Sequence, residues 1–386
     1  MTGPTALEPP TEWAELRQGC PVAPITLPSG DRALLLTRYA DVKQVLADPR
    51  FTRRLNAPDA ARLSTGESGG VFNNDMAESI PDSGEGHLRW RQLVGKWFTA
   101  KRMTALRPEI ESMAERLIDD MVAAGAPADL RAALGFPLPV WVICELLGVP
   151  GSDREAFSHW SDTMLNLTRY TDEEIASAQG EFVAYLREHV AAKRADPRDD
   201  LLSTLAADLP DDALVATGRG LLVAGHETTA NMIGKMVGML LADRRHWERL
   251  LADPSLIRTA VDEVLRFDAN PGVGLPRYIT EDAEVSGERI PAGSTVMCNM
   301  AAANRDETFF ADADELDLGR RPNPHLTFGS GTHSCIGQAL ARTELQAVLA
   351  VLLRRLPALE LAVPAAELNR VEGLVVGGLR ELPVRW

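Results

Sequence analysis

The sequence predicts a mainly α-helical protein with a smaller β-rich side. Apolar residues recur at helical spacing through most of the middle of the chain, whereas short apolar runs bounded by Gly or Pro lie near residues 33–36 and 285–300. The chain has 386 residues, of which 45% are hydrophobic and 25% charged, a globular composition that can bury a large cavity. We expect residues 1–386 to form a single domain.

The amino-terminal part is expected to begin with β structure. Residues 33–36 form a short apolar run, and apolar residues at helical spacing follow Asp41, which predicts a strand and then a capped helix. Residues 60–86 are rich in Gly, Ser, Asn and Asp and show no periodicity, so they predict a long loop. Long loops in compact proteins are often functional.

Helices are expected to dominate the chain up to Phe267. Helical spacing covers residues 87–125, 128–147, 154–167 and 172–194, and two further helices end near Phe267. Between them, Asp211 and Asp212 follow Pro210 as the start of a helix that continues to Ala242. At about 1.5 Å per residue this helix would be about 48 Å long, which is unusual in a globular protein.

The carboxyl-terminal part is expected to return to β structure before a last helix. Residues 285–300 predict a hairpin that turns around Ile290, Pro291 and Gly293. A polar meander at residues 304–321 and a Gly-rich loop follow, and helical spacing then runs from Cys335 to about Leu356.

Charge and cysteine content exclude several classes of protein. The formal net charge is −15 and no Lys/Arg-rich block offsets it, so nucleic acid is not an expected partner. The cysteines lie far apart without C-x-x-C spacing, which favours a reducing compartment over a disulfide framework. The first thirty residues lack a signal-peptide pattern, and the most apolar stretch, 134–149, is too short to span a membrane. We therefore expect a cytoplasmic protein without a membrane segment.

The glycine-rich loop Phe328-Gly-Ser-Gly-Thr-His-Ser-Cys335-Ile-Gly337 delivers one cysteine to the predicted start of a helix. Unpaired N–H groups and the helix dipole stabilise a thiolate there, and small residues allow a flat ligand to approach the backbone. A thiolate at this place could bind a metal. A zinc site of His325, His333 and Cys335 is an alternative, although no fourth ligand is evident. The other cysteines, Cys20, Cys144 and Cys298, are expected to be buried and inert.

The long helix contains a second unusual segment, Ala224-Gly-His-Glu-Thr-Thr229. Gly lowers helix stability, and a Thr hydroxyl can bond back to the preceding turn, so the helix is expected to widen or bend here. Taken alone, Ala224 and Gly225 could simply allow close helix packing, and Glu227 could be a solvated surface charge.

These segments resemble the cytochrome P450 family, and more closely its soluble bacterial members. The family's F-x-x-G-x-x-x-C-x-G loop matches residues 328–337, and its A-G-x-[DE]-T motif matches residues 224–228. The resemblance implies that Cys335 is the thiolate ligand of haem b iron and that Glu227 and Thr228 relay protons to dioxygen. It also places Ala224, Phe328, Gly329 and Gly337 against the haem and implies the family's single, mainly helical domain.

Other motifs of the family occur in the expected order. Glu263 and Arg266 match its E-x-x-R motif, which pairs with the meander and locks the cysteine loop, although an isolated pair at this spacing would be a weak surface ion pair. The resemblance implies basic residues for the two haem propionates. The matching residues are His87, Arg91, Arg277 and His333.

Substrate contacts in the family come from the loop before the propionate-binding helix, the long helix, the segment after E-x-x-R and a carboxyl-terminal turn. The resemblance points here to Phe72, Asn73, Asn74, Met76, Val223, Val273, Leu374 and Val375. Most of these residues are apolar, so a largely apolar ligand is expected, with Asn73 and Asn74 able to orient it.

The resemblance implies a monomeric monooxygenase that uses O2 and two electrons from a ferredoxin and a ferredoxin reductase to hydroxylate or epoxidise a small secondary metabolite. A local basic patch could receive the ferredoxin. Its candidate residues are Lys96, Lys101, Arg102 and Arg342.

Two alternative functions remain open from the sequence. Asn73-Asn74-Asp-Met76, Gly274-Leu-Pro-Arg277 and Arg321-Pro-Asn-Pro324 resemble family members that couple aromatic cyclodipeptides by C–C bond formation. A non-catalytic haem-thiolate sensor or ligand carrier is the other alternative, but it would have no use for a proton relay at Glu227 and Thr228.

Overall fold

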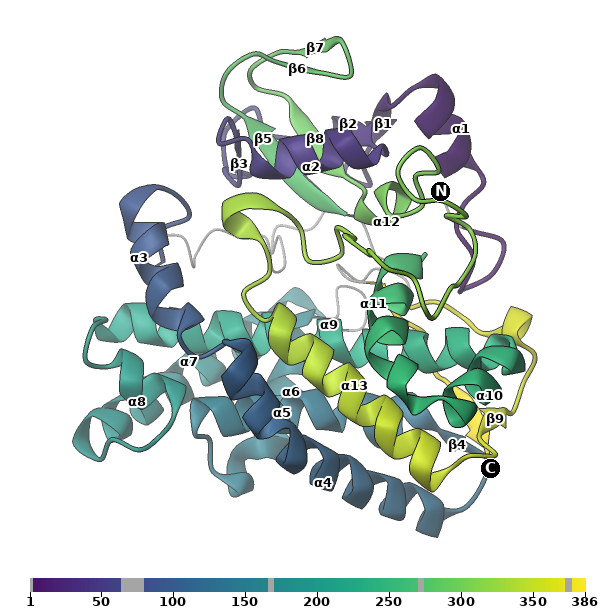
Figure 1. The fold of residues 1–386 in the computed structure, drawn as a ribbon. Coiled ribbons are helices and arrows are strands. Elements are labelled where there is room, and N and C mark those ends of the chain that lie inside the picture. The colour runs from purple at the N-terminus through teal and green to yellow at the C-terminus, as the bar shows by residue number, and fades with distance from the viewer. Residues whose placement is uncertain (1–2, 64–79, 166–169, 270–273, 372–376) are drawn as a thin grey trace.

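The protein is described from a computed structural model, which places residues 3–63, 80–165, 170–269, 274–371 and 377–386. A large helical part lies beside a smaller part built on a sheet, as Figure 1 shows, so the mainly helical prediction is confirmed. The main helices are α1 (Glu12–Gly19), α2 (Tyr39–Ala47), α3 (Gly84–Gly95), α4 (Ala100–Ala124), α5 (Pro137–Leu147), α6 (Arg154–Leu165), α7 (Asp172–Ala195), α8 (Leu201–Leu205), α9 (Asp211–Ala242), α10 (Arg244–Ala252), α11 (Ile257–Phe267), α12 (Met300–Ala303) and α13 (Gln338–Arg355).

The principal sheet joins strands from the amino-terminal part to strands of residues 275–298, in the order β1-β2-β8-β5-β3. Strands β2 and β8 run parallel and the other neighbours run antiparallel. The bounds of these strands are Val22–Thr26 (β1), Arg32–Leu36 (β2), Phe51–Thr52 (β3), Leu275–Ile279 (β5) and Thr295–Cys298 (β8). The strand expected at residues 33–36 is therefore β2, and the helix expected after it is α2.

Smaller sheets complete the β structure. Strands β6 (Ala283–Val285) and β7 (Glu288–Ile290) form a hairpin, and β10 (Pro383–Arg385) pairs with both β4 (Ala128–Asp129) and β9 (Glu360–Leu361). The hairpin expected at residues 285–300 is wrong, because β7 pairs with β6, whereas β8 pairs with β2 and β5; the observed hairpin covers residues 283–290. The chain turns at Ser286 and Gly287, whose φ values of 51° and 78° are those that a tight hairpin turn requires. Pro291 and Gly293 instead precede β8.

Some helix boundaries also differ from the sequence prediction. Residues 87–125 form two helices, because Thr99 caps a new helix by accepting a hydrogen bond from the N–H of Arg102. The helix expected at 128–147 begins only at Pro137, after β4 and one π-helical turn (Arg131–Gly135), since proline suits the first turn of a helix. The last helix begins at Gln338 rather than at Cys335.

The long helix α9 has the predicted bounds, Asp211–Ala242, and runs through the middle of the helical part (Figure 1). It packs against α5, α7 and α13, while α13 packs along α4. Most of its residues from Thr229 onward are buried, which anchors it in the largest apolar core cluster. None of the helices in the described ranges is long and apolar enough to cross a membrane.

Candidate functional site

The cysteine loop is held in shape by its own backbone and by α2. The N–H of Cys335 donates to the carbonyl of Phe328 at 2.8 Å, and Gly329 adopts a φ of +70° that suits glycine. A Cβ on Gly331 would lie 2.7 Å from the Leu46 carbonyl oxygen, so α2 leaves no room for a side chain. Because α13 begins at Gln338, the loop presents Cys335 just ahead of the helix.

Cys335 is exposed, yet enough protein surrounds its sulfur for desolvation to matter. Burial raises the pKa of the Cys335 thiol, whereas the Gly337 N–H and the charges of Arg91 and Arg342 lower it. The chain thus offers this sulfur one hydrogen-bond donor and two guanidinium charges that favour the thiolate.

The other cysteines lack such surroundings. Cys144 and Cys298 are buried, and burial raises the pKa of each to about 12, as expected for inert thiols. Cys20 is exposed rather than buried, so that part of the prediction is wrong. It follows α1, where the chain leaves the helix before β1.

The structure brings the four basic residues predicted from the motifs together beside the cysteine loop. The rings of His87 and His333 lie 4.5 Å apart, and Arg91 donates from Nη2 to the carbonyl of Ser334 at 2.8 Å. Burial lowers the pKa of His333 to about 4, and the neighbouring charges, among them Arg91 and Arg277, act in the same direction.

A further basic residue, Arg53, belongs to this group and was missed from the sequence. It follows β3, and its charge lowers the pKa of His87, His333 and Arg277. Among the described residues, the carboxylate of Asp82 opposes the burial that lowers the pKa of Arg53. Arg53 lies outside every motif, and the only signal in the sequence is a pair of arginines after a short strand.

This donor set fits a haem with two propionates. One accessible cysteine with thiolate-stabilising neighbours is suited to bind iron. The basic side chains are suited to bind two propionates, because their positive charges would balance the two negative ones. The zinc alternative finds no support, because no three His, Cys, Asp or Glu side chains in the described part of the chain are arranged to hold a metal ion. His325 instead faces Asp262, with Nε2 3.6 Å from the carboxylate.

The predicted dioxygen segment lies in the middle of α9. The Thr228 hydroxyl donates from Oγ1 to the carbonyl of Ala224 at 2.7 Å, which is the predicted bond back to the preceding turn. Ala224 and Thr228 are exposed, Val223 is half-buried, and the Glu227 side chain is buried at 8% exposure. A surface-charge interpretation of Glu227 is therefore wrong.

Glu263 and Arg266 form a buried network instead of a surface pair. Both side chains have 0% exposure, and Arg266 donates from Nη2 to Glu263 at 2.8 Å. Arg266 also donates to the carbonyls of Asn304 and Ala313, at 2.9 and 2.7 Å. Glu263 in turn accepts hydrogen bonds from Arg320 and from the Asp317 N–H. The pair thus joins α11 to the meander that precedes the cysteine loop.

Most of the predicted substrate residues lie outside the described residues. They are Phe72, Asn73, Asn74, Met76, Val273, Leu374 and Val375. Val223 is the described member of the set.

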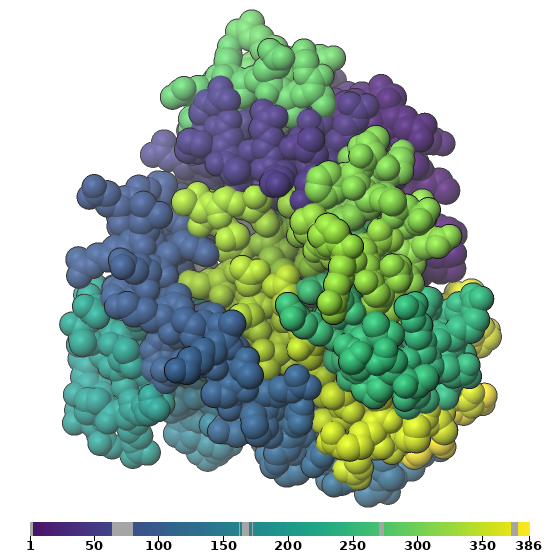
Figure 2. Space-filling model, viewed as in Figure 1, coloured from purple at the N-terminus to yellow at the C-terminus, as the bar shows by residue number. Residues whose placement is uncertain are grey.

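The predicted basic patch is only partly free of acidic partners. Arg102 pairs with Asp199 at 3.0 Å and Arg342 with Asp262 at 2.7 Å, whereas Lys96 and Lys101 are exposed. Figure 2 shows the yellow-green start of α13 beside the blue region of α3 and α4 on one face of the molecule.

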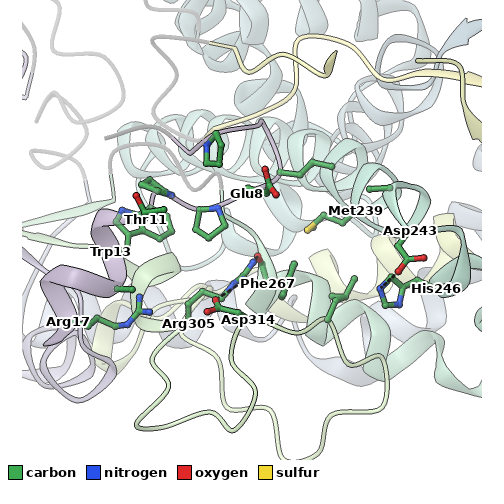
Figure 3. A pocket seen from close by; sticks show the side chains of 17 residues that line it. Glu8, Thr11, Trp13, Arg17, Met239, Asp243, His246, Phe267, Arg305 and Asp314 are labelled. Atoms are coloured by element: carbon green, nitrogen blue, oxygen red, sulfur yellow. Dashed lines mark hydrogen bonds and ion pairs between the residues drawn. The ribbon is translucent and has the colours of Figure 1, made fainter. Parts of the chain in front are cut away.

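A separate pocket of about 750 Å³ lies between the amino-terminal segment and the ends of α9 and α11 (Figure 3). Trp13, Met239 and Phe267 contribute to its walls, and Arg305 stacks over the Phe267 ring at 3.4 Å while pairing with Asp314. None of the residues that surround Cys335 lines this pocket, so it is not the site described above.

Comparisons with known proteins identify one family and several similar sequences. Residues 251–364 match the family described as Cytochrome P450. The chain is 40% identical to "Mycinamicin IV hydroxylase/epoxidase" of Micromonospora griseorubida, covering 97% of this chain and 94% of that protein. It is 40% identical to "Nocardicin C N-oxygenase" of Nocardia uniformis subsp. tsuyamanensis, covering 99% and 97%.

Solved structures give the same result. A mixed-function P450 in complex with mycinamicin IV has a TM-score of 0.91 and 40% identity, covering 98% of this chain and 97% of that chain. A cytochrome P450 hydroxylase from the leinamycin biosynthetic pathway of Streptomyces atroolivaceus has a TM-score of 0.90 and 40% identity, covering 99% and 97%. The chain therefore belongs to the cytochrome P450 family of haem-thiolate monooxygenases.

Proposed function

We propose that this protein hydroxylates or epoxidises a largely apolar secondary metabolite with O2 and two electrons from a ferredoxin and its reductase. The observation that carries the proposal is the accessible Cys335 beside the basic group of Arg53, His87, Arg91, Arg277 and His333. The names of similar proteins, which include a hydroxylase/epoxidase of mycinamicin IV and a vitamin D(3) 25-hydroxylase, support the substrate class.

The residues around Cys335 would hold the cofactor. Cys335 would bind the haem iron through its sulfur, and the basic group would bind the propionates, with the arginines able to form bidentate bonds. Phe328, Gly329 and Gly337 would lie against the cofactor and leave room for it. Haem in this place supplies the iron that activates dioxygen, and a thiolate ligand favours O–O cleavage.

Glu227 and Thr228, which follow Ala224 on α9, would hold and move protons for the reaction. The Thr228 hydroxyl donates a hydrogen bond to the Ala224 carbonyl, so the hydroxyl oxygen can still accept one from another group. A buried carboxyl such as that of Glu227 can pass a proton between internal water and the reaction site. If protons were delivered to the wrong place, electrons would be consumed and peroxide released without formation of product.

The remaining roles follow from placement. Glu263 and Arg266 are proposed as structural residues, since their network joins α11 to the meander. We further propose a cytoplasmic monomer in which residues 1–386 form one domain. We propose that neither nucleic acid nor a membrane is a partner, because the chain is acidic and its sequence predicts no membrane segment.

The test is turnover with a surrogate ferredoxin system on a panel of apolar secondary metabolites, with mass analysis of the products under ¹⁸O2. Hydroxylation or epoxidation adds one labelled oxygen atom to the substrate. Coupling of a cyclodipeptide would instead form a C–C bond with loss of two hydrogens and no added oxygen. A protein that binds ligands spectroscopically but never turns over would support the sensor alternative and contradict the proposal.

Thr228→Ala tests the proton roles. We expect the variant to retain haem and its thiolate-type reduced carbonyl spectrum, while product formed per electron pair falls by about tenfold or more. Cys335→Ser is the matched comparison, and it should lose that spectrum. Wild-type coupling in Thr228→Ala would contradict the assigned role of its hydroxyl.

A further inference from the structure

A buried polar contact joins α6 to α9 beside the proposed proton-handling residues. The Oγ atom of Ser161 lies 2.5 Å from Nδ1 of His226, and their exposed fractions are 0% and 1%. Ser161 belongs to α6, and His226 immediately precedes Glu227 on α9. Hydrogen bonds between side chains of two helices are uncommon in an apolar core, and each buried polar atom needs a partner.

His226 is held neutral. Burial lowers the pKa of His226 to about 3; a backbone hydrogen bond with Phe136 opposes this shift in part, and the charge of Arg131 adds to it. The Phe136 ring also meets the imidazole edge-on, at 4.3 Å between ring centres. With the neutral ring protonated on Nε2, Nδ1 accepts a hydrogen bond from the Ser161 hydroxyl, so this bond anchors the ring to α6.

The turn of α9 that carries His226 is also confined by α5. A Cβ on Gly225 would lie 2.5 Å from Cδ1 of Ile143, so the two helices are in close contact at this level. The same turn carries Glu227 and Thr228. Since successive side chains on a helix differ by about 100° around its axis, the direction of His226 sets the directions of both neighbours.

We propose that the hydrogen bond between Ser161 and His226 fixes the rotation of this turn and thereby aims Glu227 and Thr228. Ser161 and His226 act as positioning residues, through the turn that carries Glu227 and Thr228. The inference rests on the proposed roles of Glu227 and Thr228. Without the bond, two buried polar groups lose their partner, and the turn is free to shift until water or another group satisfies them.

The test compares Ser161→Ala and His226→Phe with two conservative variants, Ser161→Thr and His226→Asn. The conservative variants keep a hydroxyl on α6 or a polar atom near the position of Nδ1. One readout is product formed per electron pair in the holoenzyme. The second is independent of activity: hydrogen exchange of peptides from α9, measured by mass spectrometry.

We expect Ser161→Ala and His226→Phe to lower coupling by at least about threefold and to speed exchange around Glu227 by roughly tenfold. Ser161→Thr and His226→Asn should recover most of both losses, and the double variant Ser161→Ala/His226→Phe should be no worse than either single one. Phe157→Leu is the control, because Phe157 packs α6 against Phe182 of α7. It should speed exchange in α6 and α7 and leave coupling unchanged.

Wild-type coupling together with wild-type exchange in Ser161→Ala and His226→Phe would overturn the inference, as would losses no larger than those of Phe157→Leu. Thr228→Ala and Glu227→Gln are measured alongside. If they stay fully coupled, the proposed proton roles fail. If they uncouple while the Ser161 and His226 variants do not, only the positioning role is wrong.

Discussion

Among the cysteines, Cys335 is distinguished by its neighbours rather than by its burial alone. Desolvation raises the pKa of Cys335, as it does for Cys144 and Cys298, but only for Cys335 is it opposed by a backbone N–H together with two arginine charges. Besides burial, the charges of Arg53, Arg277 and Arg91 lower the pKa of the neighbouring His333. The protonation of this histidine thus depends on several basic side chains at once.

Arg53 should contribute to haem retention although no motif includes it. Arg53→Leu removes a positive charge that acts on His87, His333 and Arg277, so we expect faster haem loss, by about five- to tenfold, in transfer to excess apomyoglobin. Arg54→Leu is the matched control, since Arg54 is the next residue and its charge acts on Tyr278 rather than on His87, His333 or Arg277. Equal haem loss rates in Arg53→Leu and Arg54→Leu would remove Arg53 from the propionate group.

His226 should make the protein less stable in acid. Its pKa of about 3 in the folded protein lies below the 6.5 of an exposed histidine, so below pH 6.5 the unfolded chain takes up a proton that the folded protein does not. This stabilisation is fully present above pH 6.5 and is lost as the pH falls toward 3. By pH 5 the free energy of unfolding should drop by about 2 kcal/mol from this group.

The measurement compares Tm at pH 7.5 and pH 5 for the wild type and His226→Phe at one heating rate. All other titrating groups are shared, so the difference between the two pH responses reports His226. A smaller drop in Tm for His226→Phe is expected, and parallel pH responses would contradict a neutral buried imidazole.

At the residue scale, the sequence predicted those parts of the site that lie within short motifs. Cys335, His333 and Arg91 are recognisable because their spacing is set by a single loop or a single helix turn. Arg53 and Ser161 were not predicted, because each comes from an element far away in the sequence and meets the site only through tertiary packing. A single sequence does not encode such proximity in any local pattern.

At the element scale, α9 shows why a long periodic segment is predicted well and a short one is not. Its start after Pro210 and its end at Ala242 were both predicted, since many turns of apolar residues define one period. Strands β6 and β7 have three residues each, too few for a period, so the Pro and Gly after them were mistaken for the turn.

Gly225 should be required for the contact of α5 with α9. Gly225→Ala places a methyl group 2.5 Å from Cδ1 of Ile143, so we expect a loss of about 1–3 kcal/mol in the free energy of unfolding. Adding Ile143→Val removes the clashing carbon and should restore part of the loss. Chemical denaturation monitored by circular dichroism measures both variants.

Gly234→Ala is the control on the same helix. A Cβ there meets nothing within 4 Å, so the better helix propensity of alanine should leave stability unchanged or raise it by up to about 1 kcal/mol. If Gly225→Ala is as stable as Gly234→Ala, the α5–α9 contact tolerates a side chain and α9 is less confined than the structure indicates.

At the scale of the whole molecule, the net charge of −15 opposes any acidic redox partner, so a local basic surface has to supply the attraction. Two of the predicted patch residues are already engaged, Arg102 with Asp199 and Arg342 with Asp262. Lys96 directly follows α3 and Lys101 lies in the first turn of α4, and both are exposed. Figure 2 shows the region of α3 and α4 beside the start of α13. These two lysines are therefore the stronger candidates for contact with a ferredoxin.

Lys96→Glu and Lys101→Glu should each raise the KM for an acidic ferredoxin by about three- to tenfold at low ionic strength, and the double variant should raise it further. The effect should fade as salt is added, because exposed charges are screened beyond a Debye length of about 8 Å at 0.15 M. Arg289→Glu on β7 is the control for the same reversal of charge: Arg289 pairs with Asp282 on the β6–β7 hairpin, which lies away from α13 in Figure 1, and the variant should leave the KM unchanged. If Arg289→Glu raises the KM as much as the lysine variants do, the partner responds to the total charge of the molecule and not to a patch beside Cys335.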